Sequence, residues 1–304
     1  MQDLIIVGAG PAGLAAAIYA KRAEMDTIVL ERAPMSGGQI INTYDVDNYP
    51  GLPGISGFDL AMKFREHCDK LEVAFQEGEV VKAELSGPEK RLELKDGTAL
   101  SAKAVILATG AANRKLGVPG EEKFTGMGVS YCATCDGAFF RNKTVAVVGG
   151  GDVAIEDAIF LARLCKKVYV IHRREEFRAA KVLCTALRQM ENVEFVLNHT
   201  VEEIVGGKRV EQIRVKNKGN GVEQNLAADG VFIAVGTMPN TEVFRASGIA
   251  LDEYGYLIAG EDTKTSIPGV FAAGDVRTKR LRQVITAAAD GACAVTAAEE
   301  YLLG

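Results

Sequence analysis

The sequence has no tryptophan, only three histidines and no excess of basic residues, although it is 304 residues long. Its 35 lysines and arginines are outnumbered by 40 aspartates and glutamates, which gives a net charge of -5. Proteins that bind a nucleic-acid backbone normally carry a basic excess, so we expect no nucleic-acid partner. Because His67, His172 and His199 show no metal-ligand spacing, we also expect no metal site.

A long hydrophobic run is also missing. The longest apolar stretch, residues 4–20, is shorter than the roughly 20 residues that cross a bilayer, and glycines and a proline interrupt it. The first three residues lack the positive charge of a secretion signal. We therefore expect a cytoplasmic protein without a membrane helix, whose six cysteines form no structural disulfide framework.

One structural unit occurs twice along the chain. Residues 4–7 predict a buried strand, followed by a glycine-rich turn and an alanine-rich helix that ends near residue 21. Residues 145–148 begin a second copy, whose helix ends near residue 163. Another apolar strand follows each copy, at residues 27–30 and 168–171, as a βαβ dinucleotide-binding unit requires.

The duplication predicts an α/β fold with two Rossmann-like, three-layer nucleotide-binding domains. Both copies share an ending, because residues 105–110 match residues 231–236. Each glycine turn precedes a helix N-terminus, where backbone N–H groups bind a pyrophosphate. The alternative is a pair of structural α/β turns without ligands. Residues 267–303 have no glycine fingerprint, and spacing alone does not assign them to either copy.

The two copies differ after their second strand. Glu31 follows the first fingerprint at about the 20-residue offset of a ribose-binding carboxylate, which indicates FAD or NAD. At that offset the second copy has a basic cluster, His172, Arg173, Arg174 and Arg178. Guanidinium groups bind a ribose 2′-phosphate that a glutamate would repel, so this cluster predicts an NADP site. The alternative is a solvated basic edge.

Cys132 and Cys135 form a C-x-x-C pair just ahead of the second fingerprint. Beside two dinucleotide sites, the pair favours a redox-active dithiol supplied with electrons by a nicotinamide. Half of a zinc site and two inert buried thiols are the alternatives. The adjacent Asp136 is a candidate acid and base for the leaving thiol, or only a turn residue before Gly137.

Together these motifs resemble the low-molecular-weight bacterial thioredoxin reductases over essentially all 304 positions. The resemblance implies a homodimeric flavoenzyme that passes electrons from NADPH through FAD and the Cys132–Cys135 disulfide to thioredoxin. It also implies that an NADPH-binding domain, residues 114–240, is inserted into an FAD-binding domain made of residues 1–113 and 241–304.

The resemblance further implies individual roles. Glu31 would hold the adenosine ribose of FAD, Asp275 its ribitol and diphosphate, and Gln283 would lie near the flavin ring. Cys135 would be the thiol nearest the flavin, and Cys132 would attack the disulfide of the partner. The expected cofactor-binding residues are Gly8, Gly10, Pro11, Ala12, Gly13, Glu31, Arg32, Gly37, Gly38, Gln39, Asn48, Ala108, Thr109, Gly110, Gly149, Gly151, Asp152, Val153, Ala154, His172, Arg173, Arg174, Arg178, Gly236, Gly274, Asp275, Arg282, Gln283 and Val284.

Two other functions stay open. A reductase that serves another thioredoxin-fold partner, like the flavoprotein subunit of alkyl hydroperoxide reductase, has a similar core. Such subunits carry an extra N-terminal dithiol domain, whereas here the first fingerprint starts at residue 8. A nucleotide-binding sensor would reduce its own disulfide once and then stop, so NADPH turnover with thioredoxin separates it from an enzyme.

Overall fold

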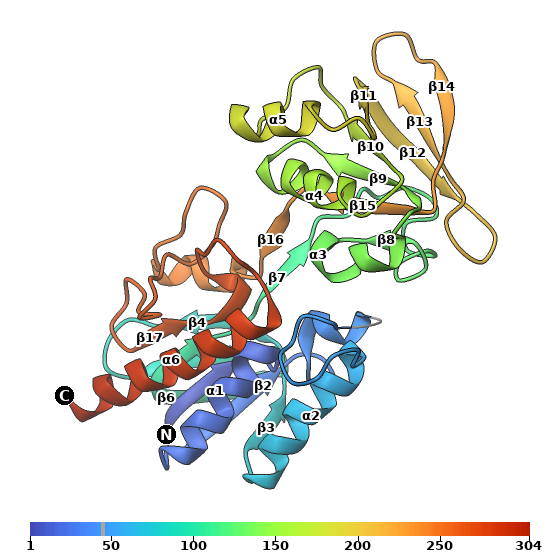
Figure 1. Ribbon diagram of the computed structural model, residues 1–304. Helices are drawn as coiled ribbons and strands as arrows, with labels where there is room; N and C mark the ends of the chain where they lie inside the picture. Colours follow the sequence, from blue (N-terminus) through green and yellow to red (C-terminus); the bar gives the residue numbers. More distant parts are fainter. Residues whose placement is uncertain (44–45) are drawn as a thin grey trace. The chain divides into compact units, whose positions relative to one another are not determined.

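The structure is a computed structural model that describes residues 1–43 and 46–304. The chain divides into two compact units (Figure 1). Unit 1 combines Met1–Ala112 with Met238–Gly304, and unit 2 is Asn113–Thr237. The chain passes between the units within two short paired strands, β7 (Ala111–Asn113) and β16 (Thr237–Pro239). Unit 2 is therefore an insertion in the sequence of unit 1.

Unit 1 contains a seven-stranded sheet in the order β3-β2-β1-β6-β5-β4, with β17 also paired to β6. Neighbours among β3, β2, β1, β6 and β17 are parallel, and β4 and β5 are antiparallel. The strands are β1 (Gln2–Val7), β2 (Thr27–Glu31), β3 (Ala74–Glu77), β4 (Val80–Glu84), β5 (Lys90–Leu94), β6 (Ala99–Leu107) and β17 (Val270–Ala272). The helices are α1 (Pro11–Arg22), α2 (Gly57–Lys70) and α6 (Val284–Leu303), with 3-10 turns η1 (Gly38–Asn42), η3 (Glu242–Ser247) and η4 (Gly274–Val276).

The side chains of β1 alternate between two hydrophobic cores. Leu4 and Ile6 pack in the core that contains α1 and α6, whereas Ile5 and Val7 pack in a core on the other face of the sheet. Both faces of the strand are covered, which explains why the sequence shows a continuous apolar run instead of a polar alternation.

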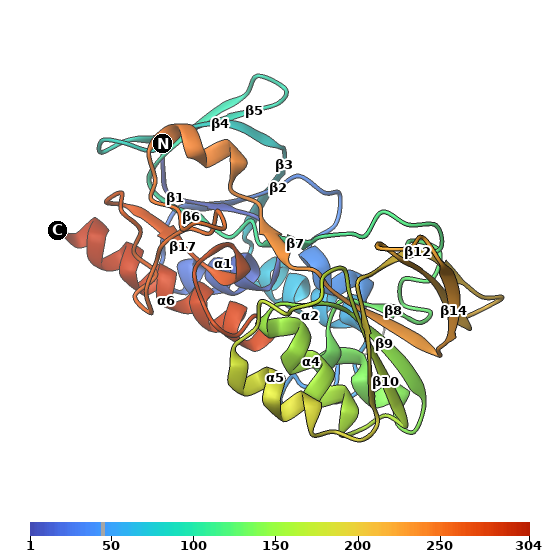
Figure 2. The same cartoon turned by 90° about the horizontal axis from the view of Figure 1, so that it is seen from above.

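Helices α1 and α6 lie side by side in both views of unit 1 (Figures 1 and 2). A Cβ atom added to Gly291 of α6 would lie 2.2 Å from the carbonyl oxygen of Ala12 in α1. The C-terminal segment, which spacing left unassigned, therefore belongs to unit 1: β17 extends its sheet and α6 packs on its first helix.

Unit 2 contains a five-stranded parallel sheet in the order β11-β10-β9-β15-β8 and a three-stranded antiparallel sheet, β12-β13-β14. The strands are β8 (Val129–Ser130), β9 (Thr144–Gly149), β10 (Lys167–His172), β11 (Val193–Leu197), β12 (His199–Val205), β13 (Gln212–Asn217), β14 (Glu223–Ala227) and β15 (Gly230–Ala234). The helices are α3 (Ala133–Asp136), α4 (Asp152–Ala162) and α5 (Lys181–Arg188), with the 3-10 turn η2 (Gly137–Phe140).

Unit 2 repeats the layering of unit 1. Val145 and Val147 of β9 pack in a core with α4, whereas Ala146 and Val148 pack in a core with the antiparallel sheet. The order β10-β9-β15 repeats β2-β1-β6 of unit 1, so the two copies predicted from the sequence fold alike. The predicted α/β fold with two Rossmann-like domains is confirmed. Within residues 1–43 and 46–304, no helix is long and apolar enough to cross a membrane.

Candidate functional site

The first glycine turn connects β1 to α1 through a close backbone approach. A Cβ atom on Gly13 would lie 1.8 Å from the carbonyl oxygen of Gly8, and Gly8 itself has a φ of 107°. Gly10 is the N-cap of α1, and Pro11 occupies its first turn, where a missing N–H costs nothing. The first turn of α1 carries no acidic residue, so its positive N-terminal end favours an anion.

Glu31, the last residue of β2, fastens the end of that strand to the glycine turn. Its Oε2 accepts a hydrogen bond of 2.7 Å from the N–H of Ala9, and its Oε1 accepts one of 2.9 Å from Ala33. The N–H of Gly37 donates to the carbonyl of Ala9 at 2.7 Å, so the segment that also contains Gly38 lies against the same turn. Arg32 directly follows the carboxylate.

Gly274 and Asp275 lie beside the start of α1. Gly274 has a φ of 80°, and a Cβ atom added to it would lie 2.9 Å from that of Ala12. Within the described chain, the buried Oδ1 of Asp275 has no hydrogen-bond partner. Burial raises the pKa of this carboxyl, while Lys279 and Arg282 oppose the rise. A buried acceptor without a partner is costly, so this oxygen suits a ligand hydroxyl group.

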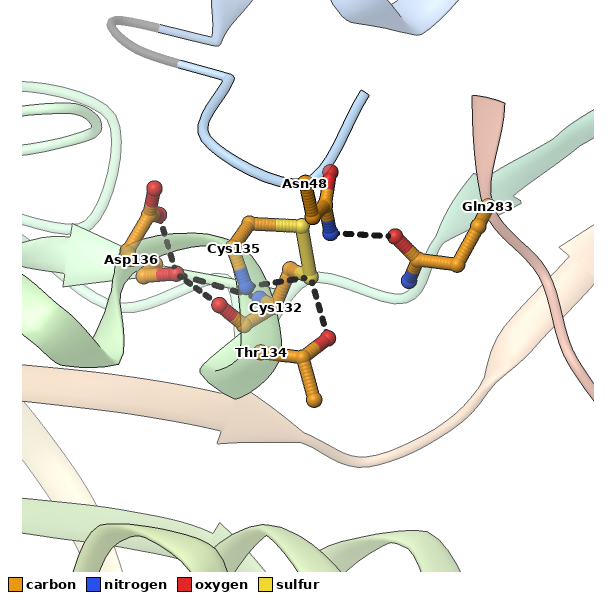
Figure 3. The surroundings of a disulfide bond; sticks show 7 residues. Asn48, Cys132, Thr134, Cys135, Asp136 and Gln283 are labelled. Atoms are coloured by element: carbon orange, nitrogen blue, oxygen red, sulfur yellow. Dashed lines mark hydrogen bonds between the residues drawn. A yellow bond between two sulfur atoms is a disulfide. The ribbon is translucent and has the colours of Figure 1, made fainter. Parts of the chain in front are cut away.

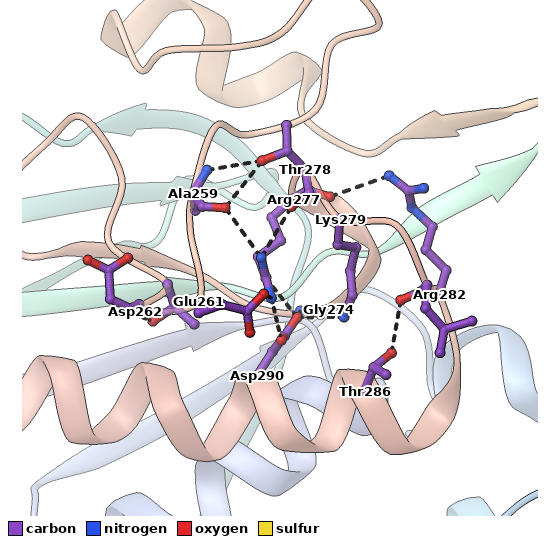
Figure 4. Close-up of polar contacts among 12 residues, drawn as sticks. Ala259, Glu261, Asp262, Gly274, Arg277, Thr278, Lys279, Arg282, Thr286 and Asp290 are labelled. Atoms are coloured by element: carbon purple, nitrogen blue, oxygen red, sulfur yellow. Dashed lines mark hydrogen bonds and ion pairs between the residues drawn. The ribbon is translucent and has the colours of Figure 1, made fainter.

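A buried charge network holds the Gly274 loop onto α6 (Figure 4). The Oδ2 of Asp290 accepts hydrogen bonds from the N–H of Gly274 at 2.9 Å, from Nε of Arg277 at 2.9 Å and from Nζ of Lys279 at 2.8 Å. Its Oδ1 accepts a 2.7 Å bond from Nη2 of Arg277. Burial raises the pKa of Asp290, but the hydrogen bonds from Arg277 and Lys279 outweigh it and hold the pKa below its usual value.

Pairwise contacts join most of the remaining expected residues of unit 1 to other parts of that unit. The Nδ2 of Asn48 donates a 2.9 Å hydrogen bond to Oε1 of Gln283, the N-cap residue that precedes Val284 in α6 (Figure 3). The side chain of Gln39 donates to the carbonyl of Ala111, just beyond β6. Three further hydrogen bonds hold residues 108–110. The N–H of Ala108 donates to the carbonyl of Val7. The hydroxyl of Thr109 donates to the carbonyl of Asn240, whose N–H donates to the carbonyl of Gly110. Arg282 places its guanidinium 4.2 Å from the ring centre of Tyr256.

The second glycine turn, between β9 and α4, also leaves no room for a side chain at Gly149. A Cβ atom on Gly149 would lie 2.4 Å from the carbonyl oxygen of Ala234 and 2.6 Å from the Cβ of Ala154. Gly151 is the N-cap of α4, whose first residues are Asp152 and the exposed Val153. The carboxylate of Asp152 accepts a 2.7 Å hydrogen bond from the N–H of Ala180, the residue before α5. Gly236, which follows β15, has a φ of 101°.

A basic hollow of about 490 Å³ opens beyond β10. Its lining contains Arg173, Arg174, Glu175, Asn198, Asn217, Lys218 and Gly219. His172 is buried under the glycine turn, where burial lowers the pKa of its imidazole. Arg178 lies beside that turn, because its N–H donates a 2.7 Å bond to the carbonyl of Gly150. The structure therefore gathers two of the expected arginines in one concave site of positive charge.

Cys132 and Cys135 form a disulfide at the start of α3, with their Cα atoms 5.3 Å apart (Figure 3). The Sγ of Cys132 accepts hydrogen bonds from the N–H of Cys135 at 3.2 Å and from the hydroxyl of Thr134 at 3.4 Å. In the described part of the chain, no group of three His, Cys, Asp or Glu side chains could hold a metal ion. The bonded pair favours the redox interpretation over inert thiols.

Asp136 contacts the disulfide segment through Ser130. The hydroxyl of Ser130 donates a 2.5 Å hydrogen bond to Oδ2 of Asp136 and accepts a 3.1 Å bond from the N–H of Cys132. Partial burial raises the pKa of Asp136, and the hydrogen bond from Ser130 opposes that rise. A carboxyl with a raised pKa keeps its proton to higher pH than an ordinary aspartate, which suits it to give a proton to a leaving thiolate.

Comparisons with known proteins place the chain in a family. Residues 2–291 match the family described as pyridine nucleotide-disulphide oxidoreductase. The thioredoxin reductase of Listeria innocua is 45% identical over 303 residues, which cover 99% of this chain and 94% of the relative. The chain belongs to the thioredoxin reductases of this oxidoreductase family.

Two solved structures support this membership. The thioredoxin reductase of Streptococcus pyogenes is 45% identical and has a TM-score of 0.94, covering 100% of this chain and 98% of that one. The thioredoxin reductase of Lactococcus lactis, in its FR conformation, is 41% identical and has a TM-score of 0.69, covering 100% of this chain and 99% of that one. The resemblance stated from the sequence motifs is thereby confirmed.

The sequence motifs did not identify three residues that lie at these sites. Ser130 lies outside the C-x-x-C motif, and only its position two residues before Cys132 could have indicated it. Asp290 gives a clearer signal, because it is an aspartate within an otherwise apolar, alanine-rich stretch of α6. Lys218 gives none, since it lies on a turn distant in sequence from the arginine motif.

Proposed function

We propose that this protein uses NADPH to reduce the disulfide of thioredoxin, with FAD and the Cys132–Cys135 disulfide as the intermediate carriers. The observation that carries the proposal is that disulfide, in a chain that is 45% identical to a thioredoxin reductase over nearly its whole length. The proposal includes a homodimer in the cytoplasm, with residues 1–113 and 241–304 as the FAD-binding domain and residues 114–240 as the NADPH-binding domain.

The residues of unit 1 fit FAD. The first glycine turn and the N-terminus of α1 would receive its diphosphate, Glu31 its adenosine ribose, and the unpartnered Oδ1 of Asp275 a hydroxyl of its ribitol. Gln39, Asn48 and Gln283 would line the flavin. When bound, FAD supplies two-electron transfer between a nicotinamide and a disulfide.

The residues of unit 2 fit NADPH. The second glycine turn and the N-terminus of α4 would receive the diphosphate, although α4, unlike α1, begins with an acidic residue, Asp152, whose carboxylate accepts a hydrogen bond from Ala180. The 2′-phosphate that distinguishes NADPH from NADH would occupy the hollow lined by Arg173 and Arg174. Planar guanidinium groups bind phosphate by paired hydrogen bonds, which supports this orientation of the dinucleotide.

Disulfide exchange would follow from the reduced cysteine pair. The Cys132 thiolate attacks one sulfur of the partner disulfide, forming a mixed disulfide and releasing the other partner sulfur as a thiolate. The Cys135 thiolate then attacks Cys132, which restores their disulfide and releases the second partner sulfur. Asp136 gives a proton to a departing thiolate, and the hydroxyl of Ser130 holds the carboxyl beside Cys132. Both electrons of the dithiol therefore leave with the partner.

The visible spectrum of the purified protein tests this function directly. We expect flavin absorption bands that bleach on addition of NADPH under anaerobic conditions and recover when oxidised thioredoxin is added. NADPH consumption should continue as long as oxidised thioredoxin remains. If the protein were purified without colour, it would be reconstituted with FAD; flavin bands that then failed to bleach with NADPH would contradict the cofactor assignment. Bleaching without recovery on addition of oxidised thioredoxin would contradict the substrate.

A further inference from the structure

The basic hollow of unit 2 has a second wall that the arginine motif does not include. One wall is the segment after β10, with Arg173, Arg174 and Glu175. The other wall is the end of β13 and the turn that follows it, with Asn217, Lys218 and Gly219. This turn belongs to the antiparallel sheet, so its distance from the motif in the sequence hides its place in the site.

Backbone hydrogen bonds fix the second wall to the first. The N–H of Asn198 donates to the carbonyl of Arg174 at 3.3 Å, and the carbonyl of Asn198 accepts a 2.8 Å bond from the N–H of Lys218. The side chain of Asn217 stiffens the turn, because its Oδ1 accepts hydrogen bonds from Gly219 at 2.8 Å and Asn220 at 3.2 Å. The backbone of Lys218 is therefore held at the edge of the hollow.

The charges around the hollow leave a positive excess. Nearby cations on the same sheet face carboxylates, since Arg214 pairs with Glu203 at 2.8 Å and Lys216 lies 3.8 Å from Glu223. Across residues 1–43 and 46–304, Lys218 forms no ion pair, and the same holds for the two arginines of the hollow. Three cations thus line the hollow against one acidic side chain, Glu175.

We propose that Lys218 is a specificity-determining residue that binds the 2′-phosphate of NADPH from the wall opposite Arg173 and Arg174. The inference rests on the proposed function and extends it to a residue outside the glycine fingerprint and the arginine motif. An ammonium group acts on phosphate as a mobile point charge, whereas the arginines give directed, paired hydrogen bonds. Lys218 should therefore raise affinity for the phosphate without orienting the nucleotide.

The test compares Lys218→Met with Lys208→Met in the FAD-loaded protein. Lys208 is an exposed lysine on the turn between β12 and β13 and is the matched control. For each variant, NADP⁺, NAD⁺ and adenosine 2′,5′-diphosphate would be titrated by calorimetry. We expect Lys218→Met to weaken NADP⁺ and the diphosphate about 3- to 10-fold, the range between an exposed ion pair and a charge-assisted hydrogen bond. NAD⁺ binding should change less than about twofold, and Lys208→Met should match the wild type.

Salt and a second variant sharpen the result. Removing one phosphate contact should make the affinity for the 2′-phosphate probes less dependent on salt, and Lys218→Arg should restore most of the affinity. If Lys218→Met and Lys208→Met behaved alike while the wild type kept its preference for NADP⁺, the inference alone would be overturned. A wild type that bound NADP⁺ and NAD⁺ equally would overturn both the proposed donor and the role of Lys218.

Discussion

The two copies of the nucleotide-binding module share a backbone plan but differ in the side chains placed beside it. In unit 1, the carboxylate of Glu31 at the end of the second strand accepts hydrogen bonds from Ala9 and Ala33. In unit 2, His172 packs under the glycine turn, and the next two side chains, Arg173 and Arg174, are exposed in a hollow. In the proposed function, the glycine turn and helix N-terminus would supply general affinity for a diphosphate, while a few side chains would choose the nucleotide.

The copies also differ in how the site is held together. Unit 1 secures its Gly274 loop with the buried Arg277–Asp290–Lys279 network, whose members are at most 8% exposed. Unit 2 secures the walls of its hollow with backbone hydrogen bonds and leaves its cations exposed. Substitutions in the first site should therefore affect folding, whereas those in the second should affect binding with little change in stability.

The largest expected effect tests a feature that only unit 2 has. Cys132→Ser or Cys135→Ser should abolish thioredoxin reduction, because exchange needs both sulfurs. The flavin should stay bound and reducible by NADPH in stopped-flow experiments, since the hydride step involves no sulfur. Cys293→Ser, at an exposed cysteine of unit 1, is the control and should retain full activity. Near wild-type turnover in either active-pair variant would remove the disulfide from the electron path.

The next effect concerns the buried network of unit 1. Asp290→Asn should lower the free energy of unfolding by about 3 kcal/mol at neutral pH, because it removes the buried carboxylate that both Arg277 and Lys279 contact and leaves Arg277 only the exposed Glu261 at 4.0 Å. The pKa of Asp290 is lowered in the folded protein, so its stabilisation is present above an unfolded value of about 3.9 and is lost as the pH falls through the lower folded pKa.

Urea unfolding of the FAD-loaded variants across pH checks this expectation. The difference between wild type and Asp290→Asn should shrink in strong acid, whereas Glu299→Gln, at an exposed position of the same helix, should match the wild type throughout. Equal stability of Asp290→Asn and wild type at pH 7 would show that unit 1 does not depend on the network. It would also weaken the contrast between the two units.

The acid role of Asp136 predicts a smaller, kinetic effect. Asp136→Asn should slow thioredoxin reduction about 100-fold, the lower end of the usual contribution of a positioned acid or base, with the KM for NADPH unchanged. Because partial burial raises the pKa of Asp136, its acid form persists to higher pH than in an ordinary aspartate and is lost as the pH rises through that value.

The pH profile of disulfide exchange should separate this role from a structural one. In the wild type, the rate of disulfide exchange should fall as the pH rises and Asp136 loses its proton. This descending limb of the pH profile should be absent in Asp136→Asn. Ser130→Ala removes the hydrogen bond that opposes the raised pKa, so it should move the limb to higher pH. Unchanged exchange in Asp136→Asn would leave Asp136 as only a turn residue.

The sequence predicts those parts of the molecule that depend on local pattern. The glycine turns are recognisable because only glycine fits where Gly13 meets the carbonyl of Gly8. The continuous apolar run of β1 is recognisable because both faces of this strand are buried. The two copies, the βαβ unit in each and the cysteine pair follow from such local constraints. The resemblance, rather than spacing, assigned the last segment to the first copy.

What the sequence could not predict depends on contacts between distant segments. Asp290 meets Gly274 and Arg277 only because α6 packs on α1, and Lys218 meets the arginine hollow only through the antiparallel sheet. The link from Ser130 to Asp136 needs the local path of β8 and α3, which no periodicity describes. Buried or bridging polar contacts of this kind leave little trace in the pattern of apolar residues.

The last effect of this series, smaller than those above, bears most directly on the difference between the copies. The double variant Arg173→Ala, Arg174→Ala should weaken NADPH binding by at least about 2 kcal/mol. Each charge-assisted contact is worth roughly 1.5–3 kcal/mol, and the expected loss lies toward the low end because both arginines are exposed to solvent. NADH binding and the unfolding free energy should change little, because the glycine turn and α4 remain intact. Arg163→Ala, at the exposed C-cap of α4, is the control. Steady-state KM values for both nucleotides, with direct titrations, would measure the split. Equal losses for NADPH and NADH would mean that the arginines do not recognise the 2′-phosphate, and that the charge difference between the two copies does not select the nucleotide.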